Sequence, residues 1–388
     1  MNNNNFYLPS SRSFVEEFNV MKLLADANKL EEKGKKIYHF ELGEPQPKTP
    51  SKVTKELEKL ITKKIPGYTP SNGIEILRNK ISKFYKDKYN LGIDPNQIFV
   101  TTGSSGAFLL TFLSCFDAGN KVAIFNPVYP AYRNILKSLN IKVLEINSDE
   151  KNNFEIDVGK IKKFKGIDGL IISNPNNPTG QVLNANELRF IYQYCETNKI
   201  KLICDEIYHG IEYERKSNSI LSFGKNAFVI NSFSKYFCMP GWRLGWAIVP
   251  KELTQNFLRL SQNLFISSGN IAQLAAVRIF DCITDLDKVV QNYKLSRNLI
   301  FKELSRFDRI KFKKPAGSFY YYLNISNLSN NSVKFARKLL NDTGIVITPG
   351  IDFDKENGLT CVRLAFSIDN KVVKEGLKKF SRWLSACY

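Results

Sequence analysis

Apolar segments alternate with amphipathic segments along the middle of the chain. Runs rich in Val, Ile, Leu and Phe predict buried strands at residues 97–102, 121–125, 141–146, 169–173, 201–204, 228–232 and 244–249. Helical periodicity falls between several of these runs, as at residues 107–116 and 186–198. The repeated order of strand, turn and helix predicts a sheet of the α/β class.

The pattern changes near Leu253. It becomes helical and then ends in short predicted strands at residues 319–323 and 361–366, followed by a last helix. This change predicts a second, smaller domain, and 388 residues are enough for two or three domains. We expect an N-terminal arm with part of the small domain at residues 1–45, a large domain at 46–280 and a small C-terminal domain at 281–388.

The formal charge of +19 raises the question of a nucleic-acid partner. The lysines are spread along the whole chain without a basic helix or a nucleic-acid module, so we expect no such partner. No apolar run is long enough to span a membrane, and the N-terminus lacks the features of a signal peptide, which predicts a cytoplasmic protein. The seven scattered cysteines and two histidines favour neither a disulfide framework nor a metal site.

Residues with chemical character follow the predicted strands at their carboxyl ends, where ligands bind in open α/β sheets. The small residues at 103–106 begin a helix and offer free N–H groups to an anion. Asp205 ends a very apolar strand and needs a cationic partner. Lys235 is framed by Phe233 and Tyr236, so we expect it to be half-buried.

The loop at residues 173–180 contains two prolines, a glycine and several asparagines, and it can present polar side chains to a flat ligand. A ring with a pyridinium nitrogen, a phenolic oxygen, an aldehyde and a phosphate requires a carboxylate, an Asn/Tyr pair, an amine and an anion site. These segments supply that set, which points to pyridoxal 5'-phosphate as the cofactor. Taken singly, each segment is typical of a turn, a helix cap or a core position; their combination favours a cofactor site.

Over nearly its whole length the chain resembles the class I/II aminotransferases that depend on pyridoxal phosphate, in the fold-type I aspartate aminotransferase superfamily. The similar segments, in order, are Leu42-Gly-Glu-Pro, Gly67-Tyr-Thr-Pro-Ser-Asn-Gly, Thr102-Gly-Ser-Ser-Gly-Ala, Asn126-Pro-Val-Tyr-Pro-Ala-Tyr, Asn174-Pro-Asn-Asn-Pro-Thr-Gly, Asp205-Glu-Ile-Tyr, Ser232-Phe-Ser-Lys, Gly241-Trp-Arg-Leu-Gly-Trp, Pro315-Ala-Gly-Ser-Phe-Tyr and Val362-Arg-Leu-Ala-Phe-Ser. The resemblance implies a large domain with a mainly parallel central sheet flanked by helices, and a smaller α+β domain. It also implies transfer of an amino group between an L-amino acid and a 2-oxo acid by a ping-pong mechanism.

The resemblance assigns roles to individual residues. Lys235 resembles the lysine that holds the cofactor covalently and later moves the substrate proton, and Asp205 resembles the carboxylate that pairs with the ring nitrogen. Asn177 and Tyr208 resemble the partners of the phenolic oxygen, and Tyr129 resembles the aromatic residue that stacks on the ring. The expected catalytic residues are Lys235, Asp205 and Tyr208.

For the cofactor phosphate, the similar positions are Ser104, Ser105, Ser232 and Arg243. Tyr68 resembles the tyrosine that reaches the phosphate in the neighbouring subunit's site. This implies a homodimer with shared active sites.

For the substrate, Arg363 resembles the arginine that binds the α-carboxylate in two parallel hydrogen bonds, a geometry that lysine cannot copy. Gly43 and Asn177 are expected to assist it. The N-terminal segment at residues 13–21 is expected to cover the site.

The motifs leave the amino donor open, and we expect an aspartate- or alanine-type enzyme. A dicarboxylate donor needs a second cation, and the candidates Arg12, Lys22 and Arg259 match no motif. Two alternatives remain: a pyridoxal-phosphate β-lyase that cleaves C–S bonds, and a non-catalytic protein that senses the cofactor. The second usually carries an added DNA-binding domain, for which the resemblance leaves no segment.

Overall fold

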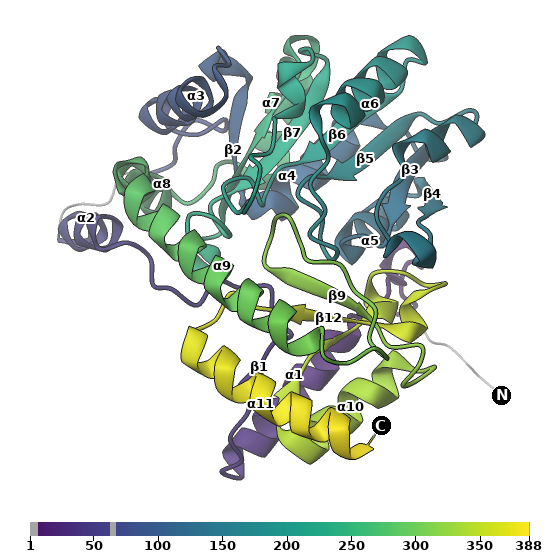
Figure 1. Ribbon diagram of the computed structural model, residues 1–388. Coiled ribbons are helices and arrows are strands. Elements are labelled where there is room, and N and C mark those ends of the chain that lie inside the picture. Colours follow the sequence, from purple (N-terminus) through teal and green to yellow (C-terminus); the bar gives the residue numbers. More distant parts are fainter. Residues whose placement is uncertain (1–6, 63–66, 388) are drawn as a thin grey trace.

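Seven strands form the central sheet of the computed structural model, which describes residues 7–62 and 67–387 (Figure 1). Their order is β2-β8-β7-β6-β5-β3-β4. The strands are β2 (Ile98–Thr102), β3 (Lys121–Asn126), β4 (Lys142–Asn147), β5 (Gly169–Ser173), β6 (Lys201–Asp205), β7 (Ala227–Ser232) and β8 (Leu244–Ile248). Every strand predicted in this region is present, which confirms the α/β class.

Strand β8 runs antiparallel to both of its neighbours, β2 and β7, whereas the other pairs are parallel. A parallel return needs a crossover connection of about a dozen or more residues that usually contains an α-helix. Only residues 233–243, with a single short 3-10 turn, join β7 to β8. The short link therefore favours the antiparallel direction, and it leaves Lys235 in a loop at the carboxyl end of β7.

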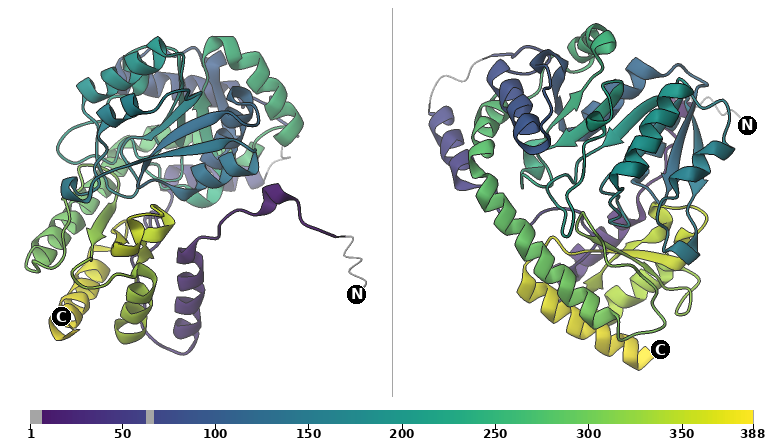
Figure 2. Two further views of the ribbon diagram at one scale, coloured as in Figure 1. Left: turned by 90° about the vertical axis from the view of Figure 1, so that its right-hand side faces the viewer. Right: turned by 45° about the horizontal axis from the view of Figure 1, so that its top comes forward.

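Both faces of the central sheet are buried, as is usual for parallel strands between two layers of helices. Neighbouring residues of β6 point to opposite faces, because Leu202 and Cys204 belong to one apolar cluster and Ile203 to the other. The helices around the sheet (Figure 2) are α3 (Glu75–Tyr89), α4 (Gly103–Cys115), α5 (Pro130–Ser138), α6 (Ala185–Thr197) and α7 (Thr254–Phe265). Helix α4 packs against β7 and β8, which brings its N-terminus to the loop that contains Lys235.

A smaller antiparallel sheet contains β11 (Thr348–Pro349), β12 (Cys361–Ala365) and β9 (Tyr320–Asn324) in that order. The short strand β1 (Tyr38–His39) pairs in parallel with β10 (Ile345–Val346). Residues 38–39 are thereby hydrogen-bonded to the C-terminal part of the chain. The domain boundaries at residues 45 and 280 stay predictions.

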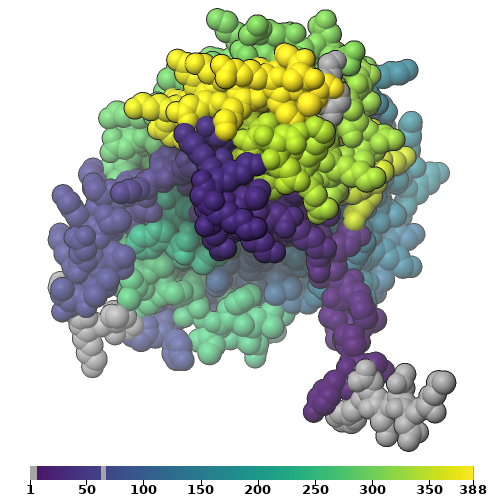
Figure 3. Space-filling model, turned by 90° about the horizontal axis from the view of Figure 1, so that it is seen from below, coloured from purple at the N-terminus to yellow at the C-terminus, as the bar shows by residue number. Residues whose placement is uncertain are grey.

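Helices α9 (Ile283–Leu304) and α11 (Asn370–Cys387) pack against each other, and α10 (Ser332–Thr343) contacts β12 of the smaller sheet (Figure 1). Figure 3 shows α1 (Asn19–Glu32), in purple, against the yellow and yellow-green C-terminal segments. Helix α2 (Ser51–Ile61) packs instead against α8 (Asn270–Ala276). Residues 1–6 of the predicted arm lie outside the described part of the chain.

Within residues 7–62 and 67–387, no helix combines the length and the apolar character needed to cross a membrane. The same residues contain no group of three or more His, Cys, Asp or Glu side chains placed to hold a metal ion. All seven cysteines are free thiols, and six of them are buried. These six pack as small core residues.

Candidate active site

A cavity of about 440 Å³ lies where the carboxyl ends of β5, β6 and β7 face the smaller sheet. Its wall combines residues from distant parts of the sequence, such as Gly43, Lys235 and Arg363. All residues predicted to form the site line this cavity except Ser232 and Tyr68. A concave space of this size suits a small molecule.

Asp205 is the last residue of β6 and is buried. Its Oδ1 accepts a hydrogen bond from the N–H of Ile207 at 3.0 Å, and its Oδ2 accepts one from the hydroxyl of Tyr132. Burial raises the pKa of Asp205 to about 6, although these two hydrogen bonds and the charge of Lys235 lower it. A cation that enters the cavity would therefore stabilise the carboxylate.

Lys235 is half-buried in the loop between β7 and β8, and its Nζ donates a hydrogen bond to the carbonyl oxygen of Gly43. Burial lowers the pKa of Lys235 to about 8, and the positive charge of Arg363 acts in the same direction. The carboxylates of Glu44 and Asp205 oppose this shift. Near pH 8 a sizeable fraction of the amine is neutral, as a nucleophile or a base requires.

Arg363 lies on β12 and is buried. Its Nη1 donates to Oδ1 of Asn177 at 3.0 Å, and its Nη2 donates to the carbonyl oxygen of Glu41 at 2.6 Å. Its Cζ atom lies 4.2 Å from the ring centre of Tyr320 and 4.7 Å from that of Phe353. Stacking and hydrogen bonds fix the guanidinium plane, as the binding of a carboxylate through two parallel hydrogen bonds requires.

Two buried tyrosines, Tyr208 from the turn after β6 and Tyr320 from β9, meet in the cavity wall, with 2.8 Å between their hydroxyl oxygens. Burial raises the pKa of Tyr208 well above its ordinary value, so the phenol keeps its proton and can donate a hydrogen bond. Gly43 lies directly against Tyr320: a Cβ atom at position 43 would come within 1.9 Å of the tyrosine hydroxyl oxygen. Only glycine fits there without displacement of Tyr320.

Asn177 and Tyr129 reach the cavity from the loops after β5 and β3. Asn177 is buried, whereas Tyr129 is half-buried and immediately precedes α5. The ring of Tyr129 contacts that of Tyr132 edge to face, with 5.5 Å between the ring centres. The cavity therefore offers an amide and an aromatic ring in addition to its charged groups.

The N-terminus of α4 forms the part of the cavity that suits an anion. Ser104 and Ser105 lie in the first turn, where backbone N–H groups have no acceptor within the helix. A Cβ atom on Gly103 would approach Nη2 of Arg243 to 2.6 Å, so the guanidinium lies directly against this turn. Free N–H groups beside a guanidinium suit a phosphate.

Ser232 does not line the cavity. Its buried hydroxyl lies 3.0 Å from the carbonyl oxygen of Leu244 and accepts a hydrogen bond from the N–H of Ser234 at 3.1 Å. Ser234, which is not among the predicted residues, lines the cavity instead. Through these contacts Ser232 stabilises the loop that contains Ser234. Its contact with the phosphate stays a prediction.

Tyr68 also lies outside the cavity, and its side chain is 85% exposed. Its segment is attached to the loop before α8, since the hydroxyl of Ser71 donates to the carbonyl oxygen of Ile266 at 2.5 Å. The N–H of Thr69 donates to the hydroxyl of Ser267 at 3.5 Å. A large aromatic side chain is thus held on the surface.

Two tyrosines of the wall, Tyr132 and Tyr320, are not among the predicted site residues. Tyr132 follows Tyr129 by three residues at the start of a helix, a spacing that places two side chains on one helix side. Tyr320 belongs to the run of tyrosines in β9, where neighbouring side chains face opposite sides of the sheet. The hydroxyl of the next residue, Tyr321, donates instead to the carbonyl oxygen of Arg297. Both spacings are visible in the sequence, but neither reveals which side faces the cavity.

The start of α1 contributes Phe18 and Val20 to the cavity wall. Asp352 holds this end of the helix: its Oδ1 accepts from the N–H of Asn19 and its Oδ2 from the N–H of Val20, each at 3.0 Å. Of the segment expected to cover the site, these two side chains reach it.

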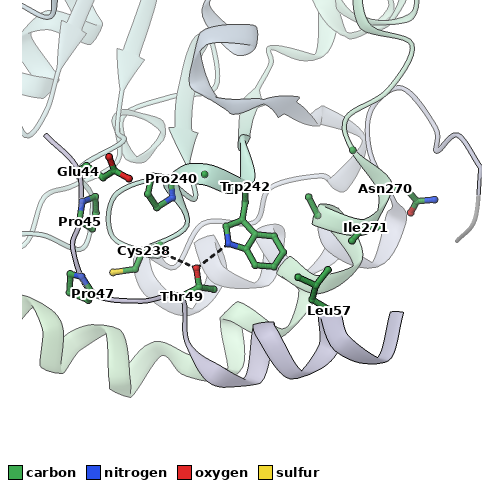
Figure 4. Close-up of a pocket in the computed structure, with 13 residues that line it drawn as sticks. Glu44, Pro45, Pro47, Thr49, Leu57, Cys238, Pro240, Trp242, Asn270 and Ile271 are labelled. Carbon is green, nitrogen blue, oxygen red and sulfur yellow. Dashed lines mark hydrogen bonds between the residues drawn. The ribbon is translucent and has the colours of Figure 1, made fainter. Parts of the chain in front are cut away.

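A second, largely apolar cavity of about 820 Å³ adjoins the site and shares Glu44, Pro240 and Gly241 with it (Figure 4). In the wall of this second cavity, the indole N–H of Trp242 donates to the hydroxyl oxygen of Thr49 at 3.0 Å. The Thr49 hydroxyl donates to the carbonyl oxygen of Cys238 at 3.1 Å. These two hydrogen bonds attach the loop that follows Lys235 to Thr49, on the side of the loop that faces the second cavity.

The family described as aminotransferase class I and II matches residues 36–380. The chain belongs to this family. This aminotransferase is 34% identical over 378 residues to the valine–pyruvate aminotransferase of Mycobacterium tuberculosis, and the alignment covers 96% of this chain and 97% of that protein. It is 31% identical over 368 residues to an aspartate aminotransferase of Sulfolobus acidocaldarius, and the alignment covers 91% of each chain.

A crystal structure of an aminotransferase from Mycobacterium tuberculosis matches the fold with a TM-score of 0.95 and 34% identity. The match covers 98% of this chain and 100% of the crystallised chain. The fold-type I architecture and the aminotransferase function inferred from the sequence are thereby confirmed. Family members generally depend on pyridoxal phosphate. Because the relatives differ in the substrates in their names, family membership leaves the donor open.

Replacement of Asp205 by Asn should stabilise the cofactor-free protein at high pH. The pKa of Asp205 is raised in the folded state, to about 6, so ionisation of this carboxyl lowers stability as the pH rises through that range. At about 1.4 kcal/mol per pKa unit, the gain in the free energy of unfolding should be on the order of 1–3 kcal/mol above about pH 7 and vanish below about pH 4. Urea denaturation at both pH values measures it.

The control is Asp308→Asn, which removes an exposed carboxylate. It should show no such pH-dependent gain. Equal stability of Asp205→Asn and wild type at high pH would contradict the assignment of Asp205 as a buried, poorly compensated acid.

Proposed function

We propose that this aminotransferase binds pyridoxal phosphate in the cavity and uses it to move an amino group between an L-amino acid and a 2-oxo acid in a two-stage, ping-pong reaction. One observation carries the proposal: an amine of lowered pKa, a buried carboxylate and the N-terminus of α4 surround a single cavity. A flat molecule with an aldehyde, a basic ring nitrogen and a phosphate complements these three groups.

Each part of the ring would have its own partner in the wall. Lys235 would bind the aldehyde carbon covalently, and Asp205 would pair with the protonated ring nitrogen. Asn177 and Tyr208 would donate hydrogen bonds to the phenolic oxygen, and Tyr129 would lie against the ring. The raised pKa of Asp205 supports this assignment, because a buried acid gains stability from a cationic partner.

Ser104, Ser105 and Arg243 would hold the phosphate at the start of α4, with Ser232 in the adjoining loop. The fit depends on Gly103, since a side chain there would displace the guanidinium of Arg243. The helix end supplies backbone donors and a favourable dipole, and the arginine supplies a full charge.

When bound, the cofactor supplies an electron-accepting ring that stabilises negative charge at the substrate α-carbon. The protein orients the substrate and moves protons. Lys235, partly neutral because its pKa is lowered, can take the α-proton and return it at a neighbouring atom. Asp205, as an anion, keeps the ring nitrogen protonated.

Arg363 is the proposed site for the substrate α-carboxylate. Its guanidinium is fixed by Asn177, by the Glu41 carbonyl and by two aromatic rings before any substrate binds. A donor held in this way has little orientational freedom left to lose, which favours reaction at its α-carbon.

We also propose a homodimer in which the partner subunit's Tyr68 completes the phosphate site. Tyr68, Ile61 and Ile266 are exposed by 85%, 60% and 51%, and they lie on neighbouring segments. The apolar cavity of Figure 4 is lined by Leu57 of α2 and by Asn270 and Ile271 of α8, the two helices that pack against each other here. Exposed apolar surface of this kind marks an interaction site.

The Lys235→Ala variant should lose covalent cofactor attachment and nearly all turnover. Borohydride reduction of cofactor-saturated wild type, followed by peptide mapping, should label Lys235, and the variant should stay unlabelled. Turnover should fall by about 10²–10⁴-fold or more, since the proton-transfer group is lost with the attachment point. Lys88→Ala is the control: Lys88 is another half-buried lysine whose pKa burial lowers, and it should not affect labelling. Labelling of wild type at a different lysine would refute the proposal.

The Arg363→Lys variant should bind amino donors more weakly. A lysine cannot form two parallel hydrogen bonds to a carboxylate, so KM should rise about 10- to 100-fold, equivalent to roughly 1.5–3 kcal/mol. Steady-state kinetics with a fixed 2-oxo acid measures this. The matched control is Arg297→Lys, at a buried arginine that binds Glu214 through two hydrogen bonds of 2.7 and 2.8 Å outside the cavity. An unchanged KM in Arg363→Lys would show that another residue binds the α-carboxylate.

Mixing two variants of reduced activity tests the shared site. A dimer of one Lys235→Ala chain and one Tyr68→Ala chain contains one site with both changes and one site with neither, if Tyr68 acts across the interface. The mixed dimer should regain about half of wild-type activity per dimer, whereas each parent stays low. Activity no higher than the mean of the parents would place Tyr68 outside the partner's site.

A further inference from the structure

The cationic side chains of the cavity all have an assigned role in the proposed function, on which this inference rests. Among residues 7–62 and 67–387, the lysines and arginines that line the cavity are Lys235, Arg243 and Arg363. Lys235 would hold the cofactor, Arg243 its phosphate and Arg363 the α-carboxylate of the donor. Within this part of the chain, no further lysine or arginine lines the cavity to receive a second carboxylate.

The cations that the sequence offers for that purpose lie elsewhere. Arg12, Lys22 and Arg259 are exposed, and none of them lines the cavity. Lys22 forms an ion pair of 2.6 Å with Glu17 on the surface. Arg12, Lys22 and Arg259 therefore cannot bind the second carboxylate of a dicarboxylate substrate in the cavity of the same chain.

The wall contributed by the N-terminal segments is apolar or negatively charged. Phe18, Val20 and Leu42 are apolar side chains of this wall, and Glu44 is a carboxylate beside them. The charge of Glu44 is felt at Lys235, whose pKa it raises against the effect of burial. A second negative charge on the substrate would meet repulsion here.

We propose that the amino donor carries a small, uncharged apolar side chain of the alanine or valine type, and that aspartate and glutamate are poor donors. A methyl or isopropyl group would leave water for contact with Phe18 and Val20, which is favourable. A second carboxylate would lose its hydration beside apolar groups and Glu44 without gaining a cation. The part of the site that one chain supplies thus selects against dicarboxylates, because it offers the second carboxylate no cation and because Glu44 repels it.

Asp352 is the positioning residue for this apolar wall. Its carboxylate accepts hydrogen bonds from the N–H groups of Asn19 and Val20, at 3.0 Å each, and from the side-chain amide of Asn19 at 2.7 Å. A carboxylate at a helix N-terminus satisfies free N–H groups and interacts favourably with the dipole. Asp352 thereby holds Phe18 and Val20 at the cavity.

Single-turnover reactions of the cofactor-loaded wild-type enzyme with individual amino acids test the donor class. The absorbance of the aldehyde form is followed until it disappears. We expect kcat/KM for alanine or valine to exceed that for aspartate and glutamate by at least about 100-fold, or about 2.8 kcal/mol at 1.4 kcal/mol per tenfold. Aspartate reacting as well as valine would overturn this inference and leave the proposed function intact. If no amino acid altered the absorbance, the proposed function itself would fail.

Binding of unreactive carboxylates gives a readout that does not depend on turnover. Calorimetric titration of the loaded enzyme should show 3-methylbutanoate binding at least about tenfold more tightly than succinate, because only succinate brings a second charge. Equal or tighter binding of succinate would overturn the inference.

Two variants locate the discrimination in the wall. Val20→Arg places a cation among the apolar groups and should raise the aspartate-to-valine ratio of kcat/KM by at least about tenfold. Met21→Arg is the matched control, because Met21 is the next residue of α1 and is 53% exposed. Asp352→Asn should raise KM for valine more than it lowers kcat, since it loosens the wall and leaves the reacting groups in place. Identical ratios in Val20→Arg and Met21→Arg would contradict the assignment.

Discussion

The carboxylate of Asp205, at the end of a buried strand, is the constraint on which the rest of the cavity depends. Its hydrogen bonds come from a neutral hydroxyl and a backbone N–H, and its pKa stays raised despite them. On the other side of the same cavity, burial lowers the pKa of Lys235. Pairs of groups whose pKa values shift toward each other in one enclosed space are typical of the acid and base positions of active sites. The proposed cofactor would bring a cation to the first group and an electrophile to the second.

The segment after β1 joins the two ends of this cavity. The Glu41 carbonyl accepts a hydrogen bond from Arg363, and the Gly43 carbonyl accepts one from Lys235. The Glu41 side chain is held in turn by His39, with 2.8 Å between Oε1 and Nδ1, and this hydrogen bond raises the pKa of His39 to about 9. Because one short segment contacts both the arginine and the lysine, any displacement of the smaller sheet relative to the central sheet alters both contacts together.

Much of the fold and of the site could be predicted from local sequence. The strands of the central sheet are buried on both faces, so they read as nearly continuous apolar runs, and β5 has the predicted bounds. Asp205, Asn177 and Lys235 were recognisable because each follows such a run, and parallel strands bring their carboxyl ends to one edge. Helical periodicity was visible only at residues 107–116, whereas α4 begins at Gly103, because the small residues of its first turn carry no apolar pattern.

Other features depend on contacts between segments that are distant in sequence. The direction of β8 follows from its short link to β7. Ser234 lines the cavity in place of Ser232, because the Ser232 hydroxyl bonds to a carbonyl oxygen of the neighbouring strand. The position of Phe18 in the wall depends on Asp352, which binds the start of α1. The amino-acid sequence by itself determined the chemical groups and most of the regular elements, because both depend on residues that are close along the chain. Only the tertiary structure decided which of those groups share a cavity and which side chains form its apolar wall, because these distances are set when the two sheets and the N-terminal helix pack together.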